Sequence, residues 1–315
     1  MGESLSRKGL FHLCVVYIVW STTYLAMRVG VNPSNGFPPF AFGALRMAVA
    51  ASILLLMARL QGVRTKPTRA EIVPLVVAGN LLWCGGNGLV LWAEQYIPSG
   101  FSCLMVSASP IWATLIELCL YRKRPSAALV ASLLVGFAGV AVLSMTSLGS
   151  RGSADFFAIV ALVLSPLCWV LGSVFQARRP VNLAPQVMSG YHHLAAFFGF
   201  LIASLALGES APHPSLSAWT AWGYLVIFGS VGAFTSYVFA LRLLPINIVM
   251  TYAYVNPVLA LLLGRLLLNE PITVRTLLGA GLVVVSVFAV FHFRQQTKAG
   301  APQLSEAESV PVDGV

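Results

Sequence analysis

The sequence predicts an all-helical integral membrane protein with ten transmembrane helices, arranged as two inverted five-helix repeats. Of the 315 residues, 58% are hydrophobic and only 9% are charged, whereas about 25% of the residues of a soluble domain are charged. Apolar runs long enough to cross about 30 Å of hydrocarbon as a helix recur along the whole chain. Finally, prolines and glycines coincide when the chain is shifted along itself by 147 residues.

The apolar runs define the individual helices. None shows the alternation over about 10 residues that is typical of a barrel strand. The first run follows Arg7 and Lys8 and is long, without a small-residue cleavage site, so we expect it to be retained rather than removed as a signal peptide. The ten predicted spans cover residues 9–29, 38–59, 71–93, 99–120, 126–145, 156–177, 186–207, 217–241, 246–268 and 273–293.

The internal repeat is carried by residues whose backbone requirements are hard to satisfy by substitution. Because each unit has five spans, an odd number, the second unit must enter the membrane inverted. We predict repeats over 9–145 and 156–293, followed by a disordered cytoplasmic tail, 294–315. Inverted repeats are typical of secondary transporters, whose substrate sites lie between the repeats. The matched pairs are Pro38 and Pro185, Gly43 and Gly190, Ala48 and Ala195, Gly85 and Gly232, Pro98 and Pro245, and Pro110 and Pro257.

The net charge of +9 is explained by membrane topology rather than by nucleic-acid binding. Cytoplasmic loops of membrane proteins carry an excess of Lys and Arg. If the N-terminus is cytoplasmic, most basic residues fall on the cytoplasmic side, and we therefore expect both termini there. The loops and ends on the outer side then receive only Arg28, Arg151, Arg265 and Arg275.

Five stretches resemble the ten-helix branch of the drug/metabolite transporter superfamily, which is built from two EamA-type units. They are "VWSTTYLAMR", "ALRMAVAA", "AEQYIPSG", "SASPIWATLIE" and "YAYVNPVLALLLGRLLLNEP". The resemblance implies export of amino acids, metabolites or toxic compounds across the bacterial inner membrane. Within the group, the chain is most similar to the aromatic amino-acid exporters. It departs from the commoner pattern at Ser21 and Thr22, where many members have Gly-Ser after the tryptophan.

Prolines lie near the middle of three spans. Pro110 cannot donate a hydrogen bond to the carbonyl of Val106, and Pro257 cannot donate one to Ala253; Pro166 repeats the pattern in the sixth span. The freed carbonyls are unfavourable against lipid, so we expect them to face a neighbour or a wet cavity. The alternative is a kink that only shapes helix packing.

Polar and aromatic side chains cluster around these points at helical spacing. Together they suit an amphipathic organic solute, since aromatic faces stack on rings and can hold an ammonium group. Alternatively, an Asn bonds a neighbouring helix, or a Trp or Tyr anchors the membrane interface. The predicted substrate-binding residues are Trp20, Tyr24, Asn80, Trp83, Asn87, Ser107, Pro110, Trp169, Tyr237, Tyr254, Asn256 and Pro257.

Arg46 is the basic residue clearly within the hydrocarbon, and the repeat pairs it with His193. It could meet a substrate carboxylate. However, it lies only about 12 Å along its helix from the outer end, so we expect it to reach the interface and act structurally. His192 and His193 point about 100° apart on a helix, and the cysteines lack paired spacing. We predict no metal and no cofactor.

The residues within the spans indicate whether transport is coupled to an ion and whether the protein could instead be an enzyme or a channel. No acidic residue falls at the predicted midplane, which favours facilitated transport, although backbone carbonyls can bind sodium alone. We see neither the constellation of an enzyme nor the charged ring of a channel, and "GGNG" at 85–88 suits close packing or a hinge. The prediction is an alternating-access exporter of aromatic and other neutral amino acids, with drug-like or cationic compounds or other metabolites as the alternative. The expected partners are the solute and the lipid bilayer, with no nucleic acid; a monomer is compatible with the sequence.

Overall fold

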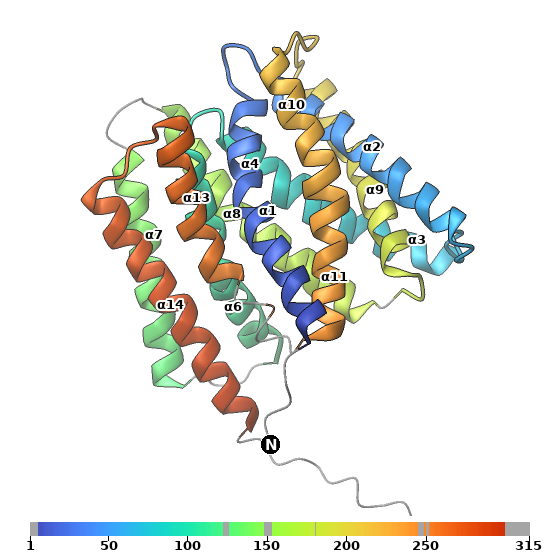
Figure 1. The fold of residues 1–315 in the computed structure, drawn as a ribbon. Coiled ribbons are helices and arrows are strands. Elements are labelled where there is room, and N and C mark those ends of the chain that lie inside the picture. Colours follow the sequence, from blue (N-terminus) through green and yellow to red (C-terminus); the bar gives the residue numbers. More distant parts are fainter. Residues whose placement is uncertain are drawn as a thin grey trace, which may run out of the picture.

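The computed structural model describes residues 6–121, 126–147, 153–179, 181–244, 249 and 252–299. All regular structure in these ranges is helical, and they contain no strand. Figure 1 shows the helices gathered into one bundle, in which helices from both halves of the chain lie beside one another. The predicted all-helical fold is confirmed.

The first half of the chain begins its helices close to the predicted bounds. α2 starts at Pro39, where the missing N–H of proline costs nothing because the first turn of a helix leaves its N–H groups unpaired. The elements are α1 (Arg7–Gly30), α2 (Pro39–Leu60), α3 (Arg69–Gly79), η1 (Asn80–Asn87), α4 (Gly88–Ala93), α5 (Ser99–Val106), α6 (Ser109–Tyr121) and α7 (Ala127–Ser147).

The second half repeats this order and starts α9 at Pro185. Its last helix runs past residue 293, the predicted end, because Arg, Gln and Lys are good helix formers. Residues 300–315, the rest of the predicted tail, lie outside the described residues. The elements are α8 (Ser153–Arg178), α9 (Pro185–Ala206), α10 (Leu216–Tyr224), η2 (Leu225–Ala233), α11 (Phe234–Leu243), α13 (Tyr252–Leu268) and α14 (Val274–Ala299).

The bundle has the length and the surface of a membrane protein. In the part of the chain that the structure describes, six helical segments are long and apolar enough to cross a bilayer, and shorter apolar helices lie in α7, α13 and α14. Leu60, Leu205 and Leu266 are between 73% and 79% exposed. Such side chains are stable when they face lipid, so the outward face of the bundle is suited to hydrocarbon.

Corresponding helices of the two repeats pack against each other. α2 lies along α9 on one side of the bundle, and α7 lies along α14 on the other (Figure 1). The third helix of each repeat changes to π-helical geometry in its middle, at η1 and at η2. A shift of 147 residues carries 80–87 onto 227–234, which overlaps η2. The repeat is therefore visible in helix geometry as well as in sequence.

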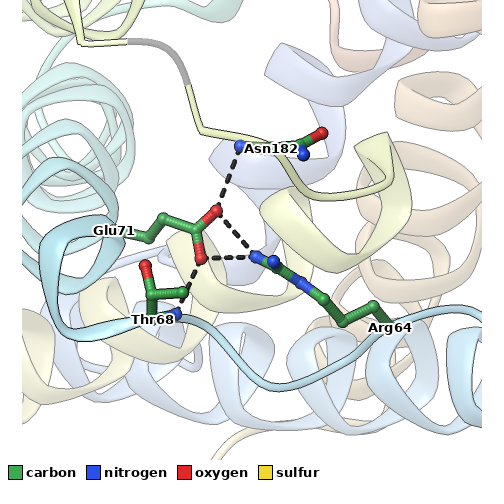
Figure 2. A network of polar contacts seen from close by, with 4 residues as sticks. All are labelled: Arg64, Thr68, Glu71 and Asn182. Atoms are coloured by element: carbon green, nitrogen blue, oxygen red, sulfur yellow. Dashed lines mark hydrogen bonds and ion pairs between the residues drawn. The ribbon is translucent and has the colours of Figure 1, made fainter.

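Two loops fix the starts of these third helices. Figure 2 shows Glu71, in the first turn of α3, accepting hydrogen bonds from the guanidinium of Arg64 and, at 3.1 Å, from the backbone N–H of Asn182. The repeat partner of Asn182 is Asn35, whose carbonyl accepts a hydrogen bond from Ser215 N, just before α10, at 2.9 Å. Each repeat thus forms a hydrogen bond that holds the start of the third helix of the other repeat.

The fourth predicted span is not one helix. α5 ends at Val106 and α6 begins at Ser109, with a turn at Ser107 and Ala108 between them. Pro110 therefore lies in the first turn of a helix, where its missing N–H is tolerated. The Val106 carbonyl accepts a hydrogen bond from the Ser109 hydroxyl at 2.6 Å. A nearby side chain thus takes the place of the missing amide, and the expectation that this carbonyl also faces a neighbour or a wet cavity stays a prediction.

The other two prolines lie inside continuous helices. α8 continues through Pro166, and α13 continues through Pro257. Pro166 helps to line a small apolar hollow beside the break in the fourth span, together with Met105 and Ile111. The repeat-related prolines 110 and 257 thus have different local geometry, one at a helix start and one within a helix.

Candidate substrate-binding site

Arg46 extends from α2 into the bundle. Its side chain is only 3% exposed. Nε donates a hydrogen bond to Oγ of Ser230 at 3.0 Å, and Nη1 donates one to Oδ1 of Asn87 at 3.1 Å. The prediction that Arg46 reaches the interface is therefore wrong, because the two π-helical segments, η2 and η1, present polar side chains to it inside the bundle.

The charge of Arg46 is not balanced by an acid. Within the described ranges, one ion pair is present, between Arg64 and Glu71. No carboxylate in these ranges lies within ion-pair distance of Arg46. Ser230 and Asn87 are neutral. A guanidinium has five N–H donors, and its planar fork matches a carboxylate in bidentate geometry. Arg46 is consequently a buried cation with the capacity to bind an anionic group.

Arg46 and His193 both contact the indole of Trp83. Cζ of Arg46 lies 5.7 Å from the centre of the indole, within range of a cation–π interaction. The imidazole of His193 is fully buried and its centre lies 4.3 Å from the same indole. Nδ1 of His193 lies 2.8 Å from the carbonyl oxygen of Ser189 and must carry the proton to donate to it. Nε2 is then an acceptor, and it has no partner among the described residues.

The contacts around this indole follow the internal repeat. The shift of 147 residues pairs Arg46 with His193. It also pairs the two hydrogen-bond acceptors of Arg46, Ser230 and Asn87, with two aromatic residues that contact His193. One half of the site is therefore cationic and polar, and the other half is aromatic. The aromatic pair is Trp83 and Phe234, with ring centres 4.3 and 6.5 Å from that of His193.

A series of aromatic rings leads from Trp83 to α1. The ring of Phe234 lies 6.5 Å from that of Trp83 and 6.4 Å from that of Tyr237. Trp20 in turn lies 5.0 Å from Tyr237 and 5.1 Å from Tyr252. All of these rings except Trp83 retain some exposed surface. The series joins helices of both repeats, where an inverted-repeat transporter binds its solute.

The "GGNG" segment allows η1 to approach α8 closely. A Cβ atom at Gly86 would lie 3.0 Å from the indole of Trp169, which itself lies 5.8 Å from Trp83. The hydroxyl of Ser165 donates a hydrogen bond to the Gly86 carbonyl at 2.7 Å. The close-packing interpretation of this segment agrees with the contacts, and the π-helical turn gives the Gly86 carbonyl a side-chain partner.

The structure brings five of the twelve predicted residues into this cluster and places others elsewhere. Asn80 donates to the Val76 carbonyl of its own helix at 3.0 Å and packs against Gly199 of α9. The hydroxyl of Ser107 donates to the Leu104 carbonyl at 2.7 Å. Asn80 therefore contributes to helix packing, and Ser107 caps the end of α5. The five that cluster are Trp20, Trp83, Asn87, Trp169 and Tyr237.

The remaining predicted residues form no hydrogen bond or ring contact with the indole of Trp83 in the described part of the chain, or their side chains lie outside that part. Tyr24 is half-buried on α1 and packs against the hydrophobic core. Asn256 is buried on α13, with Oδ1 lacking a hydrogen-bond partner among the described residues, and Pro257 follows it. Pro110 and Tyr254 lie in described helices, but their side chains are outside the described part of the chain.

Sequence reasoning gave no substrate-binding role to five members of the cluster. A signal was available for four of them, because the shift that pairs residue 46 with residue 193 also pairs 83 with 230 and 87 with 234. No comparable pattern marks the fifth residue, at position 252. The five are Arg46, His193, Ser230, Phe234 and Tyr252.

The chemistry of the cluster suits a solute with two different ends. Arg46 provides a cationic group for a carboxylate, and the ring series that includes Trp20 provides faces for an aromatic group or an ammonium. Among the described residues, no group of three or more His, Cys, Asp or Glu side chains is arranged to hold a metal ion. The site therefore offers recognition by charge and stacking.

Comparison with known proteins gives a consistent picture. The model of the EamA-like transporter family matches residues 7–145 and again residues 156–292. An uncharacterized inner membrane transporter of Escherichia coli K12, YedA, is 32% identical over 281 residues, which cover 88% of this chain and 89% of that protein. A probable terminal-alkyne amino-acid exporter of Streptantibioticus cattleyicolor is 25% identical, covering 82% of this chain and 90% of that protein. One crystal structure matches with a TM-score of 0.62 at 21% identity, over 94% of this chain and 100% of that chain, and it shows the fold alone.

Proposed function

Because the chain belongs to the EamA-like transporter family, we propose that it exports aromatic and other neutral amino acids from the cytoplasm. In this proposal it works by alternating access, with the two repeats rocking against each other around a site between them. The inner membrane location follows from the transporter homologues and the apolar helices. The outward direction rests on the family resemblance.

The observation that carries the proposal is the unbalanced charge of Arg46 beside the indole of Trp83. Every free amino acid carries an α-carboxylate, which would neutralise Arg46 and accept two of its N–H groups at once. The name of the Streptantibioticus relative, a probable amino-acid exporter, supports the same class of solute.

The same charge argues against cations that lack a carboxylate. A second positive charge about 5 Å from Arg46 would be repelled by about 3 kcal/mol at an effective dielectric constant of about 20. A zwitterion avoids this cost, because its carboxylate lies at Arg46 and its ammonium can lie on the faces of Trp20 or Tyr237. The arrangement therefore favours amino acids over drug-like amines.

Counterflow in liposomes tests the proposal. Purified protein would be reconstituted with unlabelled L-phenylalanine inside, and uptake of labelled L-phenylalanine would be measured. We expect saturable counterflow that competes with L-tryptophan and L-leucine. Phenethylamine, which has the same ring and amino group but no carboxylate, should compete at least tenfold more weakly, given about 1.5 to 3 kcal/mol for a charge-assisted hydrogen bond.

Three results would contradict the proposal. If no amino acid were transported, amino acids would be excluded as the substrate class. Non-saturable flux would indicate a channel rather than a carrier. Equal competition by phenethylamine and L-phenylalanine would show that the carboxylate is not recognised. Protein that elutes as a single species and unfolds cooperatively on heating provides the control for folding.

A further inference from the structure

Glu94 is a buried carboxyl group that the substrate site does not use. It follows α4 directly, its side chain is 0% exposed, and neither carboxyl oxygen has a hydrogen-bond partner among the described residues. Arg28, in the last turn of α1, donates its hydrogen bond to the backbone carbonyl of Glu94 rather than to the carboxyl group. The carboxyl group is therefore buried, and among the described residues it has neither a hydrogen-bond donor nor a directly paired cation.

The titratable and charged groups near Glu94 come from three elements. From α1 these are Tyr24 and Arg28, from α5 Cys103, and from the segment between α13 and α14 a second acid, Glu270. Only Arg28 is cationic, and its guanidinium forms no ion pair with the carboxyl group in the described part of the chain. A negative charge on Glu94 would face that of Glu270.

Glu270 is hydrogen-bonded to the start of α5. It accepts hydrogen bonds from the backbone N–H and the hydroxyl of Ser99, both at 2.8 Å, and from the backbone N–H of Gly100 at 3.1 Å. A carboxylate at a helix N-terminus is stabilised by these N–H groups and by the helix dipole. Its position is also fixed at Gly264, where a Cβ atom would collide with the carboxylate. The hydrogen bonds from Ser99 and Gly100 to Glu270 join the first repeat to the second.

We propose that Glu94 is a proton-binding site, which holds a proton while the contact between Ser99 and Glu270 is closed. A neutral carboxylic acid needs no counter-charge, whereas an isolated buried carboxylate is strongly unfavourable. When the start of α5 separates from Glu270, water reaches both carboxyl groups. The Glu94 O–H bond then breaks, its electron pair stays on the carboxylate, and the proton passes to that water; the reverse step precedes closure.

The proton leaves and returns at the same end of the bundle. The site therefore makes closure depend on pH without itself moving protons across the membrane, and it is compatible with facilitated transport. The opening step rests on the proposed alternating access. The binding of the proton in the closed state does not, because it depends only on burial.

Infrared spectroscopy tests the site directly and needs no solute. A protonated carboxyl group absorbs at a frequency where a carboxylate does not, so wild type at about pH 7 should show a band that Glu94→Gln lacks. Glu209→Gln is the matched control, because the carboxyl group of Glu209, unlike that of Glu94, accepts hydrogen bonds from the backbone N–H groups of Phe40 and Ala41 at 2.9 and 2.8 Å. Its spectrum should retain the band. A wild type without the band, or a band that persists in Glu94→Gln, would overturn the proposal.

A second variant keeps the test valid if Glu94→Gln does not fold. In Glu270→Gln the negative charge facing Glu94 is absent, so the band should disappear at a lower pH than in wild type. An unchanged or higher midpoint would contradict the proposed arrangement. Failure of amino-acid counterflow, by contrast, would leave this spectroscopic result unaffected, so the two proposals fail separately.

Hydrogen exchange tests the link to closure. As the pH rises from about 6 to about 9, amides at the start of α5, in residues 99–104, should exchange faster in wild type than the intrinsic chemistry explains. In Glu94→Gln, which is neutral at every pH, this additional increase should be absent. The same increase in both proteins would show that closure does not depend on a proton at Glu94.

Discussion

Arg46 and His193, which the internal repeat relates, contact the same indole from α2 and α9. Cζ of Arg46 lies 5.7 Å from the indole centre of Trp83, and the imidazole centre of His193 lies 4.3 Å from it. The two side chains occupy equivalent positions but differ in charge, since Arg46 is cationic and His193 is buried with an open acceptor nitrogen. The repeat therefore builds a nearly symmetric frame, and the differences between these residues give the site two distinct ends.

Arg46→Gln tests the carboxylate anchor. Removing the guanidinium should raise the KM for L-phenylalanine counterflow by about tenfold to a hundredfold, corresponding to about 1.5 to 3 kcal/mol for a charge-assisted contact. Arg46→Lys keeps the charge but loses the planar fork, so an intermediate KM is expected. Arg59→Gln, at the exposed end of α2, is the control and should transport like wild type. Normal KM in Arg46→Gln would exclude Arg46 from substrate binding.

Trp20→Ala tests the ring series. Loss of the stacking surface should raise the KM for L-phenylalanine by about tenfold, or about 1.4 kcal/mol. The KM for L-alanine should change much less, because this solute has no ring. Trp219→Ala is the control. The side chain of Trp219 is 45% exposed and packs against Phe37, so its removal should leave both KM values unchanged. Equal losses for both amino acids in Trp20→Ala would indicate a structural defect instead.

Gly86→Ala tests the close approach of η1 to α8. The new methyl group would lie 3.0 Å from the indole of Trp169, and such overpacking costs about 1 to 3 kcal/mol. We expect a lower temperature of unfolding and weaker transport. Gly223→Ala is the matched control, since no atom lies within 4 Å of a Cβ there. It should be neutral or slightly stabilising, because Ala favours a helix by about 1 kcal/mol over Gly.

Ser109→Ala tests the break in the fourth span. The variant removes the hydroxyl that bonds the half-buried Val106 carbonyl at 2.6 Å, and a typical hydrogen bond contributes about 0.5 to 1.5 kcal/mol to stability. Thermal unfolding should therefore begin at a lower temperature. Ser173→Ala is the control, because the Ser173 hydroxyl bonds the Trp169 carbonyl within a continuous helix at an exposed position. If both variants unfold like wild type, the hydroxyl of Ser109 does not stabilise the break.

The helices and the repeat could be predicted because they depend on local and periodic properties. An apolar run of sufficient length has few alternatives to a transmembrane helix, since its backbone must satisfy its own hydrogen bonds in lipid. The break after Val106 was harder to predict, because it depends on the hydroxyl of Ser109, the residue directly before Pro110, which donates to the Val106 carbonyl in place of the missing amide. Half of the clustered residues were also absent from the predicted site. The spacing of residues along one helix does not show which side chains of other helices lie against it.

The sequence by itself determined the membrane class, the helical fold and the two repeats, because hydrophobicity, proline and glycine act within the chain segment that carries them. Only the tertiary structure decided the state of Arg46. Whether a long cationic side chain reaches the membrane surface or turns inward depends on the partners it meets, and Ser230 lies 184 residues away. The same holds for Glu94, which looks like an ordinary residue at a helix end until α1, α5 and Glu270 enclose it.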